Sequence, residues 1–142
     1  MTFWVGVASH DHVRMAVAGG FIQLAHGKHA PVQRLSPGDW IALYSTRTSI
    51  SGGEALQAFT AIGRVADGPP YEFDQAPGFR PLRRDVTYLK SRECSVRPLI
   101  GSLTFLKGGP NWGIAFRRPV FAVSKDDFER IADEMGADIN VS

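Results

Sequence analysis

The sequence predicts a single α+β domain organised around a small β-barrel. Within residues 35–67, two strands at 40–44 and 56–65 carry apolar residues on both faces, so both faces of each strand should be covered. Pro37 and Gly38 predict a turn before the first strand, because proline presets φ and glycine tolerates positive φ. A polar, glycine-bearing loop joins the two strands as a hairpin. We expect function at this open end of the hairpin.

The length and composition fit one domain over residues 1–142. A chain of this size can bury a core without disulfides or metals, and 44% hydrophobic and 21% charged residues are ordinary globular values. No apolar run approaches the roughly 18 residues of a membrane span, and the first residues lack the features of a signal peptide. The lone Cys94 cannot form an internal disulfide, so we expect a cytoplasmic protein without membrane contact.

Before the hairpin, the sequence predicts a buried strand over 3–8 and a short helix with Ser9 as its N-cap. The apolar positions of this helix follow i, i+3, i+4 spacing: Val13, Ala16 and Val17. Glycines at 19–20 should end the helix, and a short strand is expected over 21–24. Residues 26–31 are polar and include a glycine and a proline, which predicts a loop and no regular element.

After the hairpin, residues 79–89 predict an irregular strand interrupted by a proline. Residues 96–105 have helix-like apolar spacing, and 119–123 predict the last strand. Ser124 is followed three residues later by an acid, the pattern of a helix N-terminus. The face of that last helix is apolar at Phe128, Ile131, Ala132 and Met135. Gly136 should end it.

Charge is distributed unevenly although the net charge is only +2. From Ser124 onward six acidic and two basic side chains give −4, so the first 123 residues carry +6. Six basic residues lie between Arg80 and Arg97, against only Asp85 and Glu93. This pattern indicates either a polyanion partner on one face or arginines scattered over a solvated surface.

Four histidines fall early in the chain, at His10, His12, His26 and His29. A zinc site needs three or four ligands, and neither a helical His-x-x-x-His pair nor a second cysteine supports one. The sequence places no base near Cys94 that could make it a nucleophile. Walker, dinucleotide-binding and nucleophile-elbow motifs are also missing. We therefore expect no metal, no cofactor and no enzymatic activity.

Aromatic side chains close to basic ones are the remaining signal. Each pairing alone is more often core or edge packing, but four of them fall at expected strand ends or in loops. Together they favour a base-stacking pocket with phosphate contacts around it. The pairings are Trp4 with His10, Tyr44 with Arg47, Phe79 with Arg80 and Arg83, and Trp112 and Phe116 with Arg117 and Arg118.

A series of short motifs runs through nearly the whole chain. They lie at residues 3–13, 19–21, 26–28, 30–31, 37–40, 44–45, 57–63, 77–79, 83–86, 97–99, 112–113 and 116–117. In these motifs and their order the chain resembles the EVE domain, a PUA-like family related to YTH modules. It departs from the family near Thr48 and Ser49, where members often carry an acidic residue, and the loop at 45–54 varies in length.

The resemblance implies a small PUA-like mixed β-barrel flanked by short helices, with a C-terminal strand and amphipathic helix. It also implies a nucleic-acid-binding reader that takes a modified nucleobase into an aromatic pocket on the barrel, for example a modified cytosine in DNA or a modified RNA base. Carried over by position, the residues in or beside this pocket are Trp4, Ser9, His10, Lys28, Tyr44, Ser45, Arg47, Phe79, Arg83, Trp112 and Phe116. Phosphate contacts are expected from Arg80, Arg84 and Arg117.

A second hypothesis, from a different class, is a domain that binds a nucleotide or organic anion, or an enzyme, using the same pocket. Binding to DNA or RNA that weakens with salt would favour the reader, because phosphate contacts release counterions. Saturation by a free nucleotide or organic anion, insensitive to salt, would favour the alternative. The sequence indicates no particular protein partner.

Overall fold

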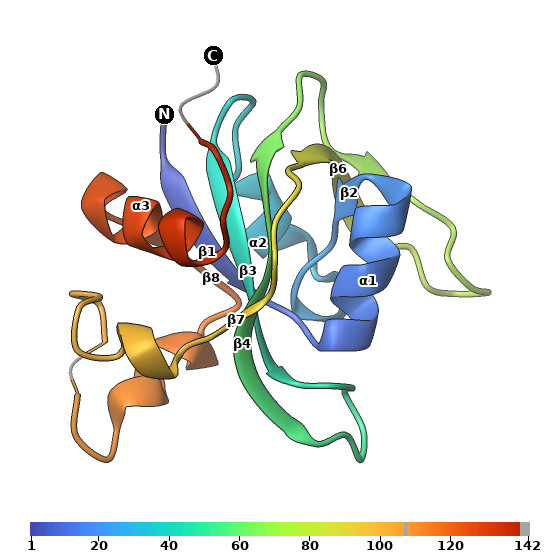
Figure 1. Ribbon diagram of the computed structural model, residues 1–142. Coiled ribbons are helices and arrows are strands. Elements are labelled where there is room, and N and C mark those ends of the chain that lie inside the picture. The colour runs from blue at the N-terminus through green and yellow to red at the C-terminus, as the bar shows by residue number, and fades with distance from the viewer. Residues whose placement is uncertain (107, 140–142) are drawn as a thin grey trace.

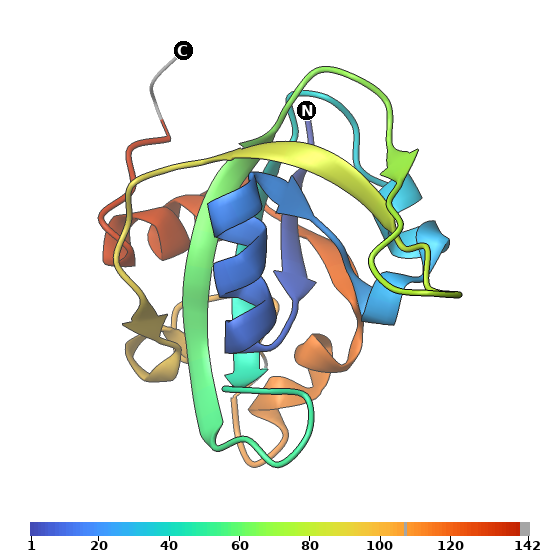
Figure 2. The same ribbon diagram turned by 90° about the vertical axis from the view of Figure 1, so that its right-hand side faces the viewer.

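The fold is one curled, mixed β-sheet with short helices packed against it, seen in a computed structural model that describes residues 1–106 and 108–139 (Figure 1, Figure 2). Eight strands of this described part pair in the order β2-β6-β4-β3-β1-β8, with β5 added to β6 and β7 to β4. The strands are β1 (Phe3–Val7), β2 (Phe21–Ile22), β3 (Trp40–Arg47), β4 (Ala55–Val65), β5 (Tyr71–Glu72), β6 (Leu82–Tyr88), β7 (Cys94–Ser95) and β8 (Val120–Val123). The helices are α1 (His10–Gly19), α2 (His29–Gln33) and α3 (Lys125–Glu134), with 3₁₀ turns η1 (Ala25–Gly27), η2 (Arg97–Leu99) and η3 (Trp112–Arg117). The predicted α+β class is confirmed, with the sheet closing into a half-barrel.

β3 and β4 form the central antiparallel hairpin that the sequence predicts. Trp40, Ala42 and Tyr44 belong to a hydrophobic cluster that includes the apolar face of α3. Ile41 and Leu43 belong to a second cluster, which includes buried residues of α1 and α2. All five side chains are at most 5% exposed. The strand is therefore covered on both faces, as its unbroken apolar run indicates.

The C-terminal strand and helix are also present as predicted, as β8 and α3. The Ser124 hydroxyl caps α3 by accepting a hydrogen bond of 3.1 Å from the Asp127 amide. Phe128 and Ile131 are fully buried on the face that meets the sheet. Gly136 follows the helix with φ of +65°, a conformation that glycine adopts readily.

Two segment predictions are wrong. Residues 26–31, expected to be a loop, contain the end of η1 and the start of α2. Pro31 fits the first turn of α2, because the amides there have no partner within the helix. Residues 96–105, expected to be a helix, form only the short turn η2 and further turns. The buried Asp127 carboxylate accepts a hydrogen bond of 3.1 Å from the Thr104 amide, and this contact connects the segment to α3.

The turn at Gly38, whose φ is +85°, places Asp39 where it ties the N-terminal strand to the central hairpin. The buried Asp39 carboxylate accepts hydrogen bonds of 2.9 Å from the Thr2 amide, the Trp4 indole nitrogen and the Ser36 amide. Burial alone would raise the pKa of Asp39, but these three donors outweigh it and hold the pKa below its ordinary value. The parallel pairing of β1 with β3 begins beside this contact, at Phe3 opposite Trp40.

We expect Asp39→Asn to lower the free energy of unfolding by about 1–3 kcal/mol, because its amide nitrogen cannot accept and leaves a buried donor unpaired. The lowered pKa means that the carboxylate stabilises the fold fully above about pH 4, and that this is lost as the pH falls through the folded-state value. Denaturant unfolding from neutral pH into acid measures both effects. Asp67→Asn, at an exposed turn, is the control. An equal acid dependence in Asp39→Asn and the wild type would contradict this assignment.

Candidate functional site

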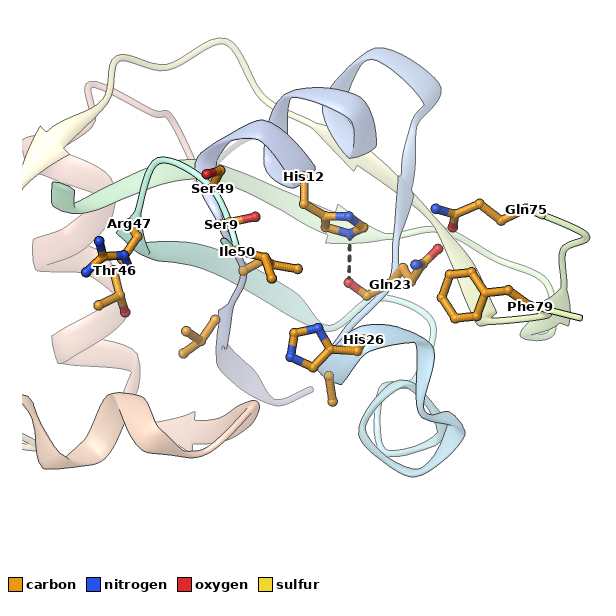
Figure 3. A pocket seen from close by; sticks show the side chains of 13 residues that line it. Ser9, His12, Gln23, His26, Thr46, Arg47, Ser49, Ile50, Gln75 and Phe79 are labelled. Atoms are coloured by element: carbon orange, nitrogen blue, oxygen red, sulfur yellow. Dashed lines mark hydrogen bonds between the residues drawn. The ribbon is translucent and has the colours of Figure 1, made fainter. Parts of the chain in front are cut away.

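A cavity of about 480 Å³, here called the main cavity, lies where β1 passes into α1 (Figure 3). Four segments that are distant in sequence supply its walls: the β1–α1 corner, the residues after β2, the end of β3 with its loop, and the loop before β6. The lining residues are Val7, Ala8, Ser9, His12, Gln23, Ala25, His26, Thr46, Arg47, Ser49, Ile50, Gln75 and Phe79. The volume falls within the range of small-molecule sites, about 300–1,000 Å³.

Backbone hydrogen bonds hold the β1–α1 corner against the end of β3. The Ala8 amide donates to the Tyr44 carbonyl at 3.1 Å, and the Asp11 amide donates to the Thr48 carbonyl at 3.0 Å. Ser9 stands at the predicted N-cap position, but its hydroxyl donates to the Asp11 carboxylate at 2.6 Å instead of capping an amide. The Ser9 oxygen therefore remains able to accept a hydrogen bond from a ligand.

A left-handed turn after β2 forms another wall. Ala25, His26 and Gly27 have φ of +50°, +56° and +87°, and such a conformation costs about 1–3 kcal/mol for each residue other than glycine. A Cβ on Gly27 would lie 2.7 Å from the Phe79 ring and 2.8 Å from Pro81. The turn thus brings the chain close enough to support the Phe79 ring at the cavity, and it puts His26 in the lining.

The buried guanidinium of Arg83 lies behind the lining, between two aromatic rings. It is 3.8 Å from the centroid of Phe21 and 3.9 Å from that of Phe73. Its Nε donates to Gln23 Oε1 at 2.9 Å, and one terminal nitrogen donates to Gln75 Oε1 at 3.2 Å. Burial lowers the pKa of Arg83, but an arginine stays protonated at neutral pH.

This arrangement fixes the direction of both glutamine amides. Arginine can only donate, so the carbonyl oxygens of Gln23 and Gln75 must face Arg83. Their NH₂ groups are then left without a hydrogen-bond partner among the described residues. Gln23 is only 5% exposed and yet lines the cavity (Figure 3). The NH₂ groups of Gln23 and Gln75 are therefore available at the main cavity as donors to a ligand.

His12 supplies the opposite polarity. Its Nε2 lies 3.1 Å from the Gln23 backbone carbonyl (Figure 3). Because a carbonyl can only accept, Nε2 carries the hydrogen, and Nδ1 of the neutral ring is an acceptor. Burial lowers the pKa of His12, and the nearby Arg83 charge adds to this, so the neutral ring prevails at pH 7.

The charged side chain in the lining of the main cavity is basic, while the Asp11 carboxylate accepts from the Ser9 hydroxyl beside it. No acidic side chain appears in its lining as far as the chain is described, whereas Arg47 does. Arg47 also donates to the Gly53 carbonyl, which steadies the loop that carries Ile50. The site therefore offers directed hydrogen bonds, one aromatic ring and a positive charge.

Within the described residues, no group of three or more His, Cys, Asp and Glu could hold a metal ion. Burial raises the pKa of the Cys94 thiol to about 11, so it is protonated at neutral pH. None of the helices in the described ranges is long and apolar enough to cross a membrane.

Three of the residues expected from the sequence line the main cavity: Ser9, Arg47 and Phe79. Arg83 does not line the main cavity, but it donates to the lining residues Gln23 and Gln75. Four others lie elsewhere. Trp4 is buried and donates to Asp39, and Ser45 is buried and shares a hydrogen bond with the Thr60 hydroxyl. His10 pairs with Glu93 at 2.6 Å, and the exposed Lys28 precedes α2.

Of the remaining expected residues, four line a second cavity, Arg80 lies at the surface and Arg84 is buried. Tyr44, Trp112, Phe116 and Arg117 line a cavity of about 350 Å³ that also includes Thr46. Arg80 forms ion pairs with Glu72 and Asp74, at 3.3 and 2.6 Å. Arg84 is buried and donates to the Gly68 carbonyl at 2.6 Å, which leaves its side chain little surface for a phosphate.

Sequence reasoning missed six polar residues of the main cavity: His12, Gln23, His26, Thr46, Ser49 and Gln75. The two histidines were considered only as metal ligands, and a lone glutamine carries no local motif. Gln23 next to two buried apolar residues, Ile22 and Leu24, was the available signal, because a buried amide needs partners.

Comparisons with known proteins agree with this architecture. Residues 2–134 match the EVE domain family. A UPF0310 protein of Mycolicibacterium vanbaalenii is 45% identical over 135 residues, covering 95% of this chain and 93% of that protein. Among solved structures, the apo Toxoplasma CPSF4-YTH domain has a TM-score of 0.60 at 11% identity, covering 99% of this chain and 92% of that one. Agrobacterium tumefaciens Atu2648 has a TM-score of 0.59 at 11% identity, covering 96% and 94%. The fold is thus similar to that of a YTH domain, and the chain belongs to the EVE domain family.

Proposed function

We propose that this domain is a nucleic-acid-binding module that holds a single extruded nucleobase in the main cavity. The observation that carries the proposal is the pair of glutamine amides that Arg83 fixes beside the Phe79 ring. Stacking on one aromatic ring is worth about 1–3 kcal/mol per base, and extruding a base costs a few kcal/mol. The hydrogen bonds at the base edge therefore have to supply the remaining affinity.

The polarity of the cavity favours one kind of base edge. Donors from Gln23 and Gln75, together with the acceptor on His12, complement an edge with two acceptors and one donor. The pairing edge of cytosine has this composition, with O2 and N3 as acceptors and the amino group as donor. Val7 and Ile50 add apolar lining for a substituent on the base. A modified cytosine is accordingly the ligand we favour.

One observation favours the alternative, a free nucleotide or organic anion in the same cavity. Several arginines expected to contact a nucleic-acid strand have other partners within the protein, since Arg80 is ion-paired and Arg83 and Arg84 are buried. Of the arginines expected at the site, this leaves Arg47 and Arg117 in the lining of the two cavities. A domain that binds a free nucleotide or organic anion would need no further cations than these two.

A binding screen separates the two functions. Modified and unmodified single strands of DNA and RNA, and the matching free nucleosides, are titrated at low and high salt. The module should prefer one base modification and bind strands more weakly as salt rises. Phe79→Ala should remove this preference, whereas Met15→Ala, an exposed residue of α1, should not. Free nucleotides that bind as tightly as strands, independently of salt, would contradict the nucleic-acid function.

We expect Gln23→Glu to lower affinity for the base at least about tenfold, because a donor to the ligand becomes an acceptor of the same shape. The introduced carboxylate still accepts from Arg83, so the melting temperature should not fall. Titration and melting of this variant are compared with Gln33→Glu, the same change at an exposed position on α2. Unchanged affinity in a folded Gln23→Glu protein would show that this amide does not touch the ligand.

The affinity should also depend on pH through His12. Its pKa lies below 6.5, so the acceptor at Nδ1 is intact above about pH 6.5 and is lost as the pH falls through the lowered value. Affinity should be constant from pH 8 to about 6.5 and then decrease in acid. His12→Gln should abolish the decrease, whereas His26→Gln, at the other histidine in the lining, should retain it. Retention of the decrease in His12→Gln would assign the titration to another group.

A further inference from the structure

The second cavity lies beside the main one, and Thr46 near the end of β3 lines both. Its volume is about 350 Å³. Tyr44, Gln57, Trp112 and Arg117 contribute to its walls, and no acidic side chain does in the part of the chain that the structure covers. The two cavities therefore share Thr46 as a lining residue, and the lining of both favours an anionic ligand over a cationic one.

Tyr44 has a feature that packing alone does not explain. The side chain is 1% exposed, with its ring stacked on Phe116 at a centroid distance of 3.6 Å and edge-on to Phe59. Its hydroxyl nevertheless has no hydrogen-bond partner among the described residues, although the side chain lines the second cavity. Burial raises the pKa of Tyr44 to about 12, so the hydroxyl is protonated and can donate. Arg84 Nε is the one fully buried side-chain polar atom without a partner in the described chain, so the Tyr44 hydroxyl reaches accessible space. The second cavity is where a partner for it can lie.

Gln57, which lines the same cavity, provides a second donor. It lies in β4 with φ of +54°, a strained conformation for glutamine, beside an irregularity in the β3–β4 register. Arg97 donates to Gln57 Oε1 at 2.6 Å, which leaves the amide NH₂ without a partner in the described chain. The Arg97 guanidinium also lies 5.2 Å from the Trp112 ring centroid. Exposed Arg117 makes no ion pair with the described residues.

We infer that the second cavity binds the nucleotide next to the extruded one on the same strand. Its phosphate accepts hydrogen bonds from the Tyr44 hydroxyl, the Gln57 amide and Arg117, and its base lies against Trp112. This inference rests on the proposed function, because Thr46 joins the second cavity to the one that holds the extruded base. A set made almost entirely of donors, beside a partly exposed indole, suits an anion that carries an aromatic group.

The test compares two probes: methylated deoxycytidine as a free nucleoside, and a trinucleotide with that base between two thymidines. Tyr44→Phe removes only the unpartnered hydroxyl, so its melting temperature should equal or exceed that of the wild type. It should weaken trinucleotide binding about tenfold, as expected for a lost hydrogen bond to a charged group, and leave nucleoside binding unchanged. Arg117→Gln should act in the same way, and Gln23→Glu should weaken both probes.

The outcomes separate the two proposals. Equal affinity of wild type and Tyr44→Phe for the trinucleotide, while Gln23→Glu still weakens both probes, overturns the second site alone. A Tyr44→Phe effect of the same size on both probes also overturns it, because the hydroxyl would then serve the main cavity. If neither probe binds the wild type, the proposed function fails and this inference fails with it.

Discussion

The buried guanidinium of Arg83 is the interaction on which the candidate site depends. A cation between two phenylalanine rings must have acceptors, and the carbonyl oxygens of Gln23 and Gln75 supply them. Both amides are thereby oriented, which reduces the side-chain entropy lost when a ligand binds. A residue that sequence reasoning assigned to the ligand thus acts one layer behind it, as a positioning residue in this account.

The fold keeps this site rigid from two directions. The hairpin of β3 and β4 is covered on both faces, so the strand end that carries Thr46 and Arg47 is continuous with the core. Asp39 ties β1 to the same hairpin, and β1 leads directly into Ser9 and the cavity wall. The turn after β2, by contrast, contains two consecutive residues in the left-handed conformation, Ala25 and His26. Such strain persists where the surrounding structure over-determines it, and it is common at binding sites.

The sequence predicted the architecture well because its strongest signals are local. The doubly apolar run in β3, the turn at Gly38 and the cap at Ser124 each act through neighbouring residues. The site was harder to predict, since it joins four segments distant in sequence. Trp4 and Tyr44 illustrate the difficulty: both are aromatic residues in strands, but one donates to Asp39 in the core and the other lines a cavity. Composition and spacing do not distinguish these environments.

The central claim is that the unpartnered glutamine amides face the ligand. It is tested most directly by following the side-chain NH₂ resonances of Gln23 and Gln75 by ¹⁵N NMR while a modified single strand is added. The account predicts that both resonances move as the strand saturates the protein, while the NH₂ resonance of Gln33, exposed on α2, stays in place. Saturation that leaves the Gln23 and Gln75 resonances unmoved would contradict the account, because the ligand would then bind outside the main cavity.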